Sequence, residues 1–357
     1  MKPDSNLPND PELPGLVAIR AGGLASALRG LSLNDRLVVG ADDDFVALSL
    51  LGAAELERES DSGWRELNCV LHGYTPGSRA TFEVRVGPRR FALKAYAKDA
   101  GPEAELYEAL AAAGLAGDSG ARVPRLLAWN RDLKLLALGW LEGRPANELL
   151  TEGQGVRAGE LAARWLQRAG SLFVTLGPEV GVARVLKKSN KGVGLLSAAD
   201  PALGRAATAL LAALERTQPD HQHHHLVHGS FYARHVLDLG DGPGVIDWDA
   251  FGHGSIEFDA GMFLATLSRH RLRNEPSAGA AAQAEEAFLA ATSGLLDSRA
   301  LAWYWAAALL HLAWRLLKRQ APAESHPLLR GAARLAEIAE ATSRRYPLEE
   351  MMHVVRG

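Results

Sequence analysis

The sequence predicts an α+β protein with two lobes, the first built on a small antiparallel sheet and the second mainly on helices. Three observations lead to this prediction. The chain has 357 residues, which is enough for two hydrophobic cores. Apolar residues alternate with period two over residues 66–96, as in strands, and beyond about residue 141 they recur at helical spacing. We therefore expect a loose tail over 1–15, a first lobe over 16–140 and a second lobe over 141–357.

The composition, the N-terminal sequence and the length of the most apolar stretch argue against several classes of protein. The formal net charge is −3 with both signs interspersed, which argues against a nucleic-acid binder. A single cysteine, Cys69, excludes an internal disulfide, and the start MKPDSNLPNDPELPG lacks the basic and apolar regions of a signal peptide. The apolar stretch Ala300–Trp314 is shorter than the roughly 20 residues of a membrane span, so it predicts a buried helix. We expect a cytoplasmic protein that binds neither nucleic acid nor membrane.

The alternation from Glu66 to Tyr96 predicts an antiparallel hairpin in the first lobe, with Gly87-Pro88-Arg89 between its strands. Its two strands place apolar side chains on one face: Phe82, Val84, Val86, Phe91, Leu93 and Ala95. Because side chains alternate, Ala92 and Lys94 share the opposite face. A lysine on a strand is usually a solvated edge residue, but this one lies on a hairpin directly before a helix, which favours a functional role.

The helix after this hairpin places a carboxylate where a cation is needed. It has Pro102 in its first turn and ends before Gly114. At about 100° per residue, Glu103 falls in the middle of the apolar stripe that includes Leu106 and Leu110. The spacing leaves two interpretations open: Glu103 pairs with Lys94, or it complements the helix dipole without a partner.

Two further strands are expected over 122–127 and 133–141, and the pattern breaks at Leu141–Pro145, where the second lobe begins. Helical spacing then predicts helices over 161–176, 201–216, 281–292, 301–319 and 327–344. The segment Gly181–Gly194 contains three lysines and is expected to be a charged loop, either on the surface or near a substrate entrance.

Charge gathers at the end of a second hairpin, between Leu226 and Phe263. Apolar residues around Val236 and Val245 flank a Gly-rich turn, and the second run leads directly into Asp247. A polar loop containing His228 precedes the hairpin. This placement suits phosphoryl transfer, in which carboxylates hold Mg²⁺ against the phosphates.

At these residues the chain resembles the aminoglycoside phosphotransferase and choline kinase family, small-molecule relatives of the protein kinases. His228-Gly229 matches the start of the family's catalytic loop, Ile246-Asp247-Trp248-Asp249 matches its metal motif, and Asp259 matches the aspartate that ties the loop down. Phe91-Ala92-Leu93-Lys94 is similar to the kinase Val-Ala-Ile-Lys strand. The resemblance implies a bilobal, protein-kinase-like fold.

The resemblance also implies ATP and Mg²⁺ as cofactors and a role for each matching residue. It favours the ion pair between Glu103 and Lys94, which positions the phosphates. Ala92 lies under the adenine, and His228 orients the catalytic loop. Asp247 and Asp249 hold the metal ion. The break at 141–145 corresponds to the hinge between the lobes.

Two positions depart from the family's pattern. Ser230 stands at the catalytic aspartate and His235 at the amide that ligates metal. A neutral imidazole suits Mn²⁺ or Zn²⁺ better than Mg²⁺, unless His235 merely fills the position.

Because serine has no useful basicity near neutral pH, two functions compete. The first is an ATP-dependent phosphotransferase, slowed by Ser230, that acts on a small hydroxyl- or amino-bearing compound of unidentified structure. The second is a pseudokinase that binds nucleotide or a protein partner without turnover.

Overall fold

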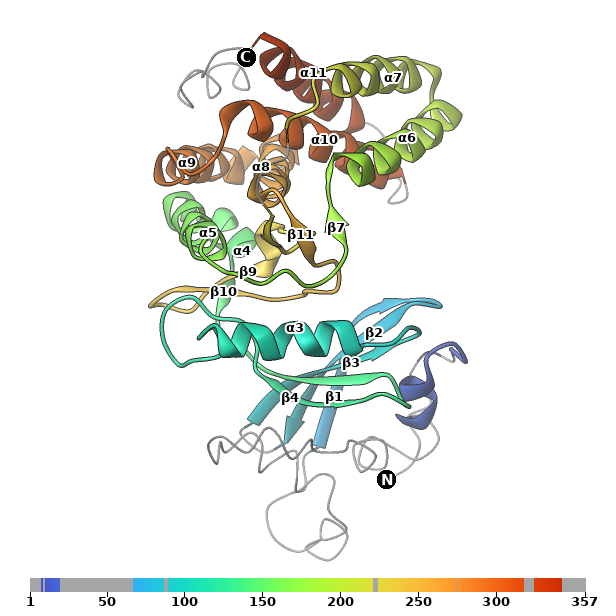
Figure 1. Ribbon diagram of the computed structural model, residues 1–357, viewed down its shortest axis with the longest axis vertical. Coiled ribbons are helices and arrows are strands. Elements are labelled where there is room, and N and C mark those ends of the chain that lie inside the picture. Colours follow the sequence, from blue (N-terminus) through green and yellow to red (C-terminus); the bar gives the residue numbers. More distant parts are fainter. Residues whose placement is uncertain are drawn as a thin grey trace, which may run out of the picture. The chain divides into compact units, whose positions relative to one another are not determined.

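A computed structural model (Figure 1) describes residues 8, 10–19, 67–86, 89–220, 224–273, 275–317 and 324–341. The chain divides into two compact units. The first comprises Met1–Gly117 and Val123–Glu142, and the second comprises Asp118–Arg122 and Gly143–Gly357. The first unit is built on an antiparallel sheet and the second is mainly helical, so the predicted fold class is confirmed.

The first unit holds a five-stranded antiparallel sheet in the order β1-β2-β3-β5-β4. Its strands are β1 (Leu67–Thr75), β2 (Arg79–Val86), β3 (Arg89–Tyr96), β4 (Leu126–Asn130) and β5 (Leu135–Gly139). The predicted hairpin is β2–β3, with Phe82 opposite Leu93 and Thr81 opposite Lys94. The predicted apolar face is buried as far as it is described; the side chain of Val86 lies outside the described residues.

The segment before the sheet packs on that apolar face. Residues 14–19 form a short helix, and Leu13, Leu16 and Ile19 are buried in the same core as the sheet's apolar side chains. The expectation of a loose tail over 1–15 is therefore wrong for residues 10–15. Apolar residues at 13, 16 and 19 lie three apart, which places them on one side of a helix that the sheet can cover.

The helix α3 (Gly101–Ala112) and strand β5 lie where the sequence predicted them, but β4 is shifted. A strand was expected over 122–127, whereas β4 begins at Leu126. Pro124 has no backbone N–H to donate to a ladder. Arg122 instead forms an isolated bridge with Gly244 of the second unit, to which it belongs.

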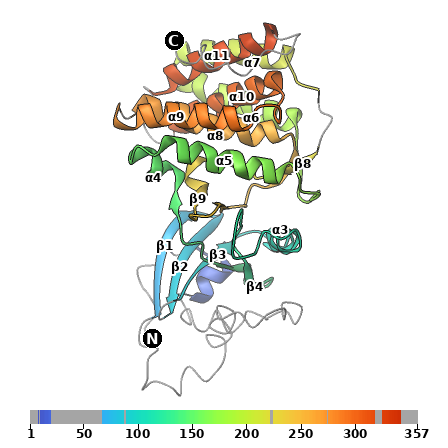
Figure 2. The same cartoon turned by 90° about the vertical axis from the view of Figure 1, so that its left-hand side faces the viewer.

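The second unit is a stack of helices above short strands. Its helices are α4 (Ala146–Thr151), α5 (Gly155–Ala169), α6 (Val182–Ala199), α7 (Pro201–Arg216), α8 (Ile256–Arg273), α9 (Glu275–Ala291), α10 (Ser298–Leu317) and α11 (Ser325–Ala341). Its short strands are β6 (Arg144–Pro145), β7 (Glu179–Val180), β8 (His225–Val227), β9 (Val236–Asp238), β10 (Pro243–Val245) and β11 (Gly252–Gly254), with a 3₁₀ turn η3 (Ala233–His235) before β9. Figure 2 shows α5, α9, α8 and α10 packed in succession.

Helix α10 forms the centre of this stack. By length and composition alone α10 could cross a membrane, but most of it is buried inside the unit, including Trp303 and Trp305. The predicted buried helix is confirmed.

Helix α6 replaces the charged loop expected over Gly181–Gly194. Its buried positions repeat every three or four residues: Val182, Val185, Ser189, Gly192, Val193 and Leu196. Ser189 and Gly192 are not apolar side chains, so the pattern of apolar residues in the sequence does not show the helical period here. The lysines at 187 and 191 lie on the exposed side.

The packing of α5 on α9 predicts that an alanine at Gly159 destabilises the protein. A Cβ at Gly159 would lie 2.2 Å from the backbone oxygen of Ala284, which cannot move without shifting α9. Alanine is favoured over glycine within a helix by about 1 kcal/mol, whereas overpacking a core costs about 1–3 kcal/mol. We expect Gly159→Ala to lower the free energy of unfolding, measured by urea denaturation.

Gly194→Ala is the matched control, because Gly194 is exposed on α6 and its added Cβ would meet nothing within 4 Å. It should be neutral or stabilising by up to about 1 kcal/mol. Equal stability of the two variants would contradict this account of the α5–α9 contact.

Candidate functional site

A buried ion pair joins β3 to α3 in the first unit. The Nζ atom of Lys94 donates to Oε1 of Glu103 at 2.9 Å, and both side chains are about 5% exposed. The hydroxyl of Tyr96 donates to the other oxygen, Oε2, at 2.5 Å. The structure thus contains the predicted pair, and Tyr96 fixes the rotamer of Glu103 so that its carboxylate stays aimed at Lys94.

The sheet face that carries Lys94 also carries a charged cluster around Glu83 that sequence reasoning missed. Arg85, Arg90 and His72 all donate to the carboxylate of Glu83, which is 3% exposed. Burial alone would raise the pKa of Glu83, but these hydrogen bonds outweigh it and lower the pKa to about 2. The guanidinium of Arg90 also stacks over Trp140, 4.3 Å from the ring centroid. The hairpin register is the feature from which this cluster could have been predicted. It pairs Glu83 with Ala92, so that Arg90 is the diagonal cross-strand neighbour of Glu83.

The turn between β1 and β2 is held by a carboxylate of the same unit. Its residue Gly77 has φ +63°, and its N–H donates to Oδ2 of Asp10 at 2.7 Å. The hydroxyl of Tyr74 donates to the same oxygen at 2.9 Å. Asp10 thus holds this turn through one backbone and one side-chain hydrogen bond.

In the second unit, Asp259 fastens the loop that follows β8. Its two oxygens accept the backbone N–H groups of His228 (2.6 Å) and Gly229 (3.0 Å). Asp259 lies in the first turn of α8 and is 2% exposed; burial raises its pKa to about 7, while the two backbone hydrogen bonds act in the opposite direction. Gly229 has φ +78° and approaches the backbone oxygen of Ala250 so closely that no Cβ would fit.

The ring of His228 connects the loop to the end of the second hairpin. Its Nε2 lies 2.8 Å from the backbone oxygen of Ile246, which can only accept, so the proton resides on Nε2. Its Nδ1 is then an acceptor, 3.3 Å from both the backbone nitrogen and Oγ of Ser230. This geometry agrees with the predicted orienting role of His228.

His235 and Asp247 meet at the far end of the loop. Nδ1 of His235 donates to the backbone oxygen of Ser230 at 2.8 Å, which leaves Nε2 with a lone pair 3.4 Å from Oδ2 of Asp247. Burial lowers the pKa of His235 to about 3, against the opposing effect of Asp247, so the imidazole is neutral at pH 7. Two acceptor atoms therefore face one another, an arrangement that a bound cation would stabilise.

The donor set at this point fits a divalent ion. An imidazole nitrogen and a carboxylate oxygen are common ligands of Mn²⁺ and Zn²⁺, and Asp247 is held in the left-handed region at φ +68°. Among the described residues, no group of three His, Cys, Asp or Glu side chains lies close enough to hold an ion. The remaining ligands would come from phosphate oxygens and water, as is usual for Mg²⁺ in phosphotransferases. Asp249, the other predicted ligand, is exposed beyond Trp248.

The chain is similar to known proteins in sequence and in fold. The model of the APH family, a phosphotransferase enzyme family, matches residues 70–301. No curated protein matches the chain.

Several solved structures are similar in fold. One is a thermostable variant of the aminoglycoside phosphotransferase APH(4)-Ia in a ternary complex with ADP and hygromycin B (16% identity, 81% of this chain and 98% of that chain covered, TM-score 0.55). Another is a choline/ethanolamine kinase family protein from Mesorhizobium loti (15% identity, 83% and 94% covered, TM-score 0.52). A third is the choline kinase LicA from Streptococcus pneumoniae (14% identity, 76% and 94% covered, TM-score 0.50).

The Glu83 cluster predicts a pH dependence of stability. The pKa of Glu83 is about 2 when folded, below its ordinary value of 4.5. Its contribution to stability is therefore complete above pH 4.5 and is lost as the pH falls from about 4.5 to about 2. Glu83→Gln should lower the free energy of unfolding at pH 7 by about 1–3 kcal/mol, because the arginines lose their acceptor.

Urea unfolding between pH 7 and pH 3 measures this effect. The variant should lose less stability on acidification than the unaltered protein, whereas Glu105→Gln on the exposed side of α3 should behave like the unaltered protein. Parallel pH profiles for Glu83→Gln and the unaltered protein would contradict the assignment.

Proposed function

Because the chain belongs to the phosphotransferase enzyme family, we propose that it is an ATP-dependent phosphotransferase that acts on a small hydroxyl- or amino-bearing compound. The Lys94–Glu103 pair is the observation that carries this proposal. A buried ion pair is often no more stabilising than apolar residues of the same volume. Its retention at the kinase positions is explained if Lys94 binds the phosphates of the nucleotide.

The other roles follow the arrangement of each unit. Ala92 shares the sheet face of Lys94 and would lie against the adenine. In the second unit, His235 and Asp247 would hold a divalent cation, with Asp249 as a further candidate ligand. When bound, that cation would neutralise charge on the transferred phosphoryl group.

Ser230 replaces the usual base without leaving the position inert. Its hydroxyl can donate to Nδ1 of His228 and still accept a hydrogen bond from the acceptor's hydroxyl group. That contact orients the acceptor's hydroxyl group, which is the nucleophile. Nδ1 of His228 carries a lone pair that can accept the proton of the Ser230 hydroxyl. Phosphoryl transfer depends mostly on positioning and electrostatics, so the reaction persists at a reduced rate.

The absence of a carboxylate at Ser230 also favours a second candidate function. A chain that retained nucleotide binding but lost turnover would act as a pseudokinase, binding nucleotide or a protein partner. The two candidates share the nucleotide site and differ only in turnover.

Nucleotide binding is the first test. Calorimetry should detect Mg²⁺-dependent ATP binding that is weakened at least about tenfold by Lys94→Met and by Asp247→Asn, because each removes a charge that faces phosphate or metal. The double variant Lys94→Met/Glu103→Leu removes the whole ion pair and guards against destabilisation by an unpaired Glu103. Lys98→Met is the control, since Lys98 is exposed just beyond β3.

The same titration tests the metal ligands. Because His235 supplies a nitrogen ligand, Mn²⁺ should support tighter ATP binding than Mg²⁺, and His235→Asn should reduce that preference. An unchanged metal preference would mean that His235 only fills its position and does not bind the metal ion. If the protein binds no nucleotide at millimolar ATP, the phosphotransferase and the nucleotide-binding pseudokinase are both excluded, and only a scaffold that binds a protein partner remains.

Restoring the carboxylate tests turnover. With a panel of hydroxylated and amino compounds, Ser230→Asp should raise the rate of ADP release by about 10²–10⁴-fold at unchanged ATP affinity, because a base acts in the transition state. Ser230→Asn is the matched control, with similar volume and no base.

The outcomes separate the two functions. Turnover by the unaltered protein supports the slow phosphotransferase, whereas turnover only after Ser230→Asp supports the pseudokinase. ATP binding without turnover in either form would overturn the enzyme proposal.

A further inference from the structure

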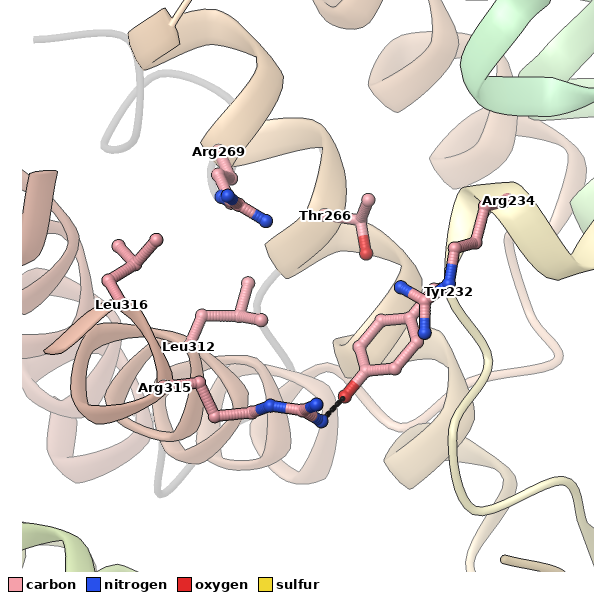
Figure 3. A pocket seen from close by; sticks show the side chains of 7 residues that line it. All are labelled: Tyr232, Arg234, Thr266, Arg269, Leu312, Arg315 and Leu316. Atoms are coloured by element: carbon pink, nitrogen blue, oxygen red, sulfur yellow. Dashed lines mark hydrogen bonds between the residues drawn. The ribbon is translucent and has the colours of Figure 1, made fainter. Parts of the chain in front are cut away.

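A pocket lies beside the loop that carries Ser230, inside the second unit (Figure 3). It is an open hollow continuous with solvent, and its cavity of about 40 Å³ has room for a small group of a ligand rather than for a whole ligand. We call it the arginine pocket, and its lining residues are Tyr232, Arg234, Thr266, Arg269, Leu312, Arg315 and Leu316. Sequence reasoning did not single out any of these as site residues, because they come from three separate segments.

The lining of the arginine pocket is positively charged. Arg234 comes from the loop, Arg269 from α8 and Arg315 from α10, and none of the described lining residues is acidic. Glu324, which is not a lining residue, lies 3.5 Å from Arg269. Arginines are therefore the charged groups of the described lining.

Tyr232 organises two of the arginines. Its ring is 4% exposed and lies under the guanidinium of Arg234, whose Cζ is 4.4 Å from the ring centroid. Its hydroxyl accepts from Nη1 of Arg315 at 3.4 Å. Figure 3 shows Arg234 and Arg315 reaching Tyr232 from opposite sides, with Arg269 projecting from α8. Guanidinium groups ordered in this way lose less entropy when they bind an anion.

Further cations lie next to Arg315 on α6. Lys188 is exposed on α6 but partly desolvated by its neighbours, and this desolvation together with the nearby charges of Arg184 and Arg315 lowers its pKa. The positive potential thus extends from the pocket toward α6. A polycationic ligand would be repelled here, whereas an anion would be attracted.

Two lining residues of the pocket lie on the same loop as the residue at the catalytic position. The backbone N–H of Tyr232 donates to the oxygen of Ser230 at 2.7 Å, and Arg234 lies between Ser230 and His235 in the same loop. Since Ser230 and Tyr232 are two residues apart, their Cα atoms lie within about 7 Å of each other. A ligand whose charged end sits in the pocket can present another group toward Ser230.

We propose that the arginine pocket binds the anionic group, a phosphate or a carboxylate, of the acceptor that this chain phosphorylates. The proposal rests on the proposed phosphotransferase function and narrows its substrate to an anionic hydroxyl or amino compound. Arginine suits this task because its planar fork binds phosphate and carboxylate oxygens in pairs.

The test compares neutral compounds with their anionic derivatives. Binding is measured by calorimetry for glycerol against glycerol 3-phosphate, glucose against gluconate and glucose 6-phosphate, with inorganic phosphate as a free anion and kanamycin as a polycation. At least one anionic organic compound should bind at least about tenfold tighter than its neutral partner, and this preference should decline as potassium chloride is raised.

The variants Arg234→Gln and Arg269→Gln should each reduce the preference about tenfold, since each removes one charged contact. Arg205→Gln, an exposed arginine on α7 outside the pocket, should leave it unchanged. If single variants unfold more readily, the double variant Arg234→Lys/Arg269→Lys keeps the charge and should retain part of the preference.

Each outcome decides the proposal. Equal binding of neutral and anionic compounds, tighter binding of kanamycin, or no binding of any anion at millimolar concentration would overturn it. Tight binding of inorganic phosphate with no added affinity for the organic anions would overturn the acceptor role. ATP binding is measured separately. If the protein does not bind ATP, the proposed phosphotransferase function is contradicted. If it binds ATP but shows no preference for anionic compounds, only the proposed role of the arginine pocket is contradicted.

Discussion

The carboxylate of Asp259 is the contact on which the candidate site of the second unit depends. It binds two consecutive backbone N–H groups, at His228 and Gly229, from within the first turn of α8. With the backbone so fixed, the ring of His228 reaches Ile246 and the ring of His235 reaches the oxygen of Ser230. One buried side chain thus positions the loop, the end of the second hairpin and the pair His235–Asp247.

The sequence predicted the parts of the site that are close in the chain or regular in spacing. Strand alternation and helical position placed Lys94 and Glu103 on their elements, and the resemblance to kinases favoured their pairing. Asp259 was identified from its match to the family's pattern. Glu83 was missed because an acidic residue in an alternating strand looks solvent-facing, and only the hairpin register brings Arg90 to it. Helix α6 was missed because Ser189 and Gly192 interrupt its apolar stripe, and Pro124 moved β4.

The arginine pocket lay beyond sequence reasoning for a different reason. Tyr232, Arg269 and Arg315 are separated by more than thirty residues each, and only the packing of α8 against α10 brings them together. Its charge bears on function because electrostatic complementarity selects the class of ligand more than it sets affinity. The fold of this family leaves the acceptor open, and we propose the arginine pocket as the feature that restricts it.

Transfer of phosphate to a small molecule is the central claim, and one measurement tests it directly. The unaltered protein is incubated with ATP carrying a labelled γ-phosphate and a mixture of cellular small molecules, and the products are separated by charge and identified by mass spectrometry. The account predicts a labelled product that carries an anionic group besides the new phosphate and is absent with Lys94→Met/Glu103→Leu. Labelled inorganic phosphate alone, or a labelled product that persists in that variant, would contradict it.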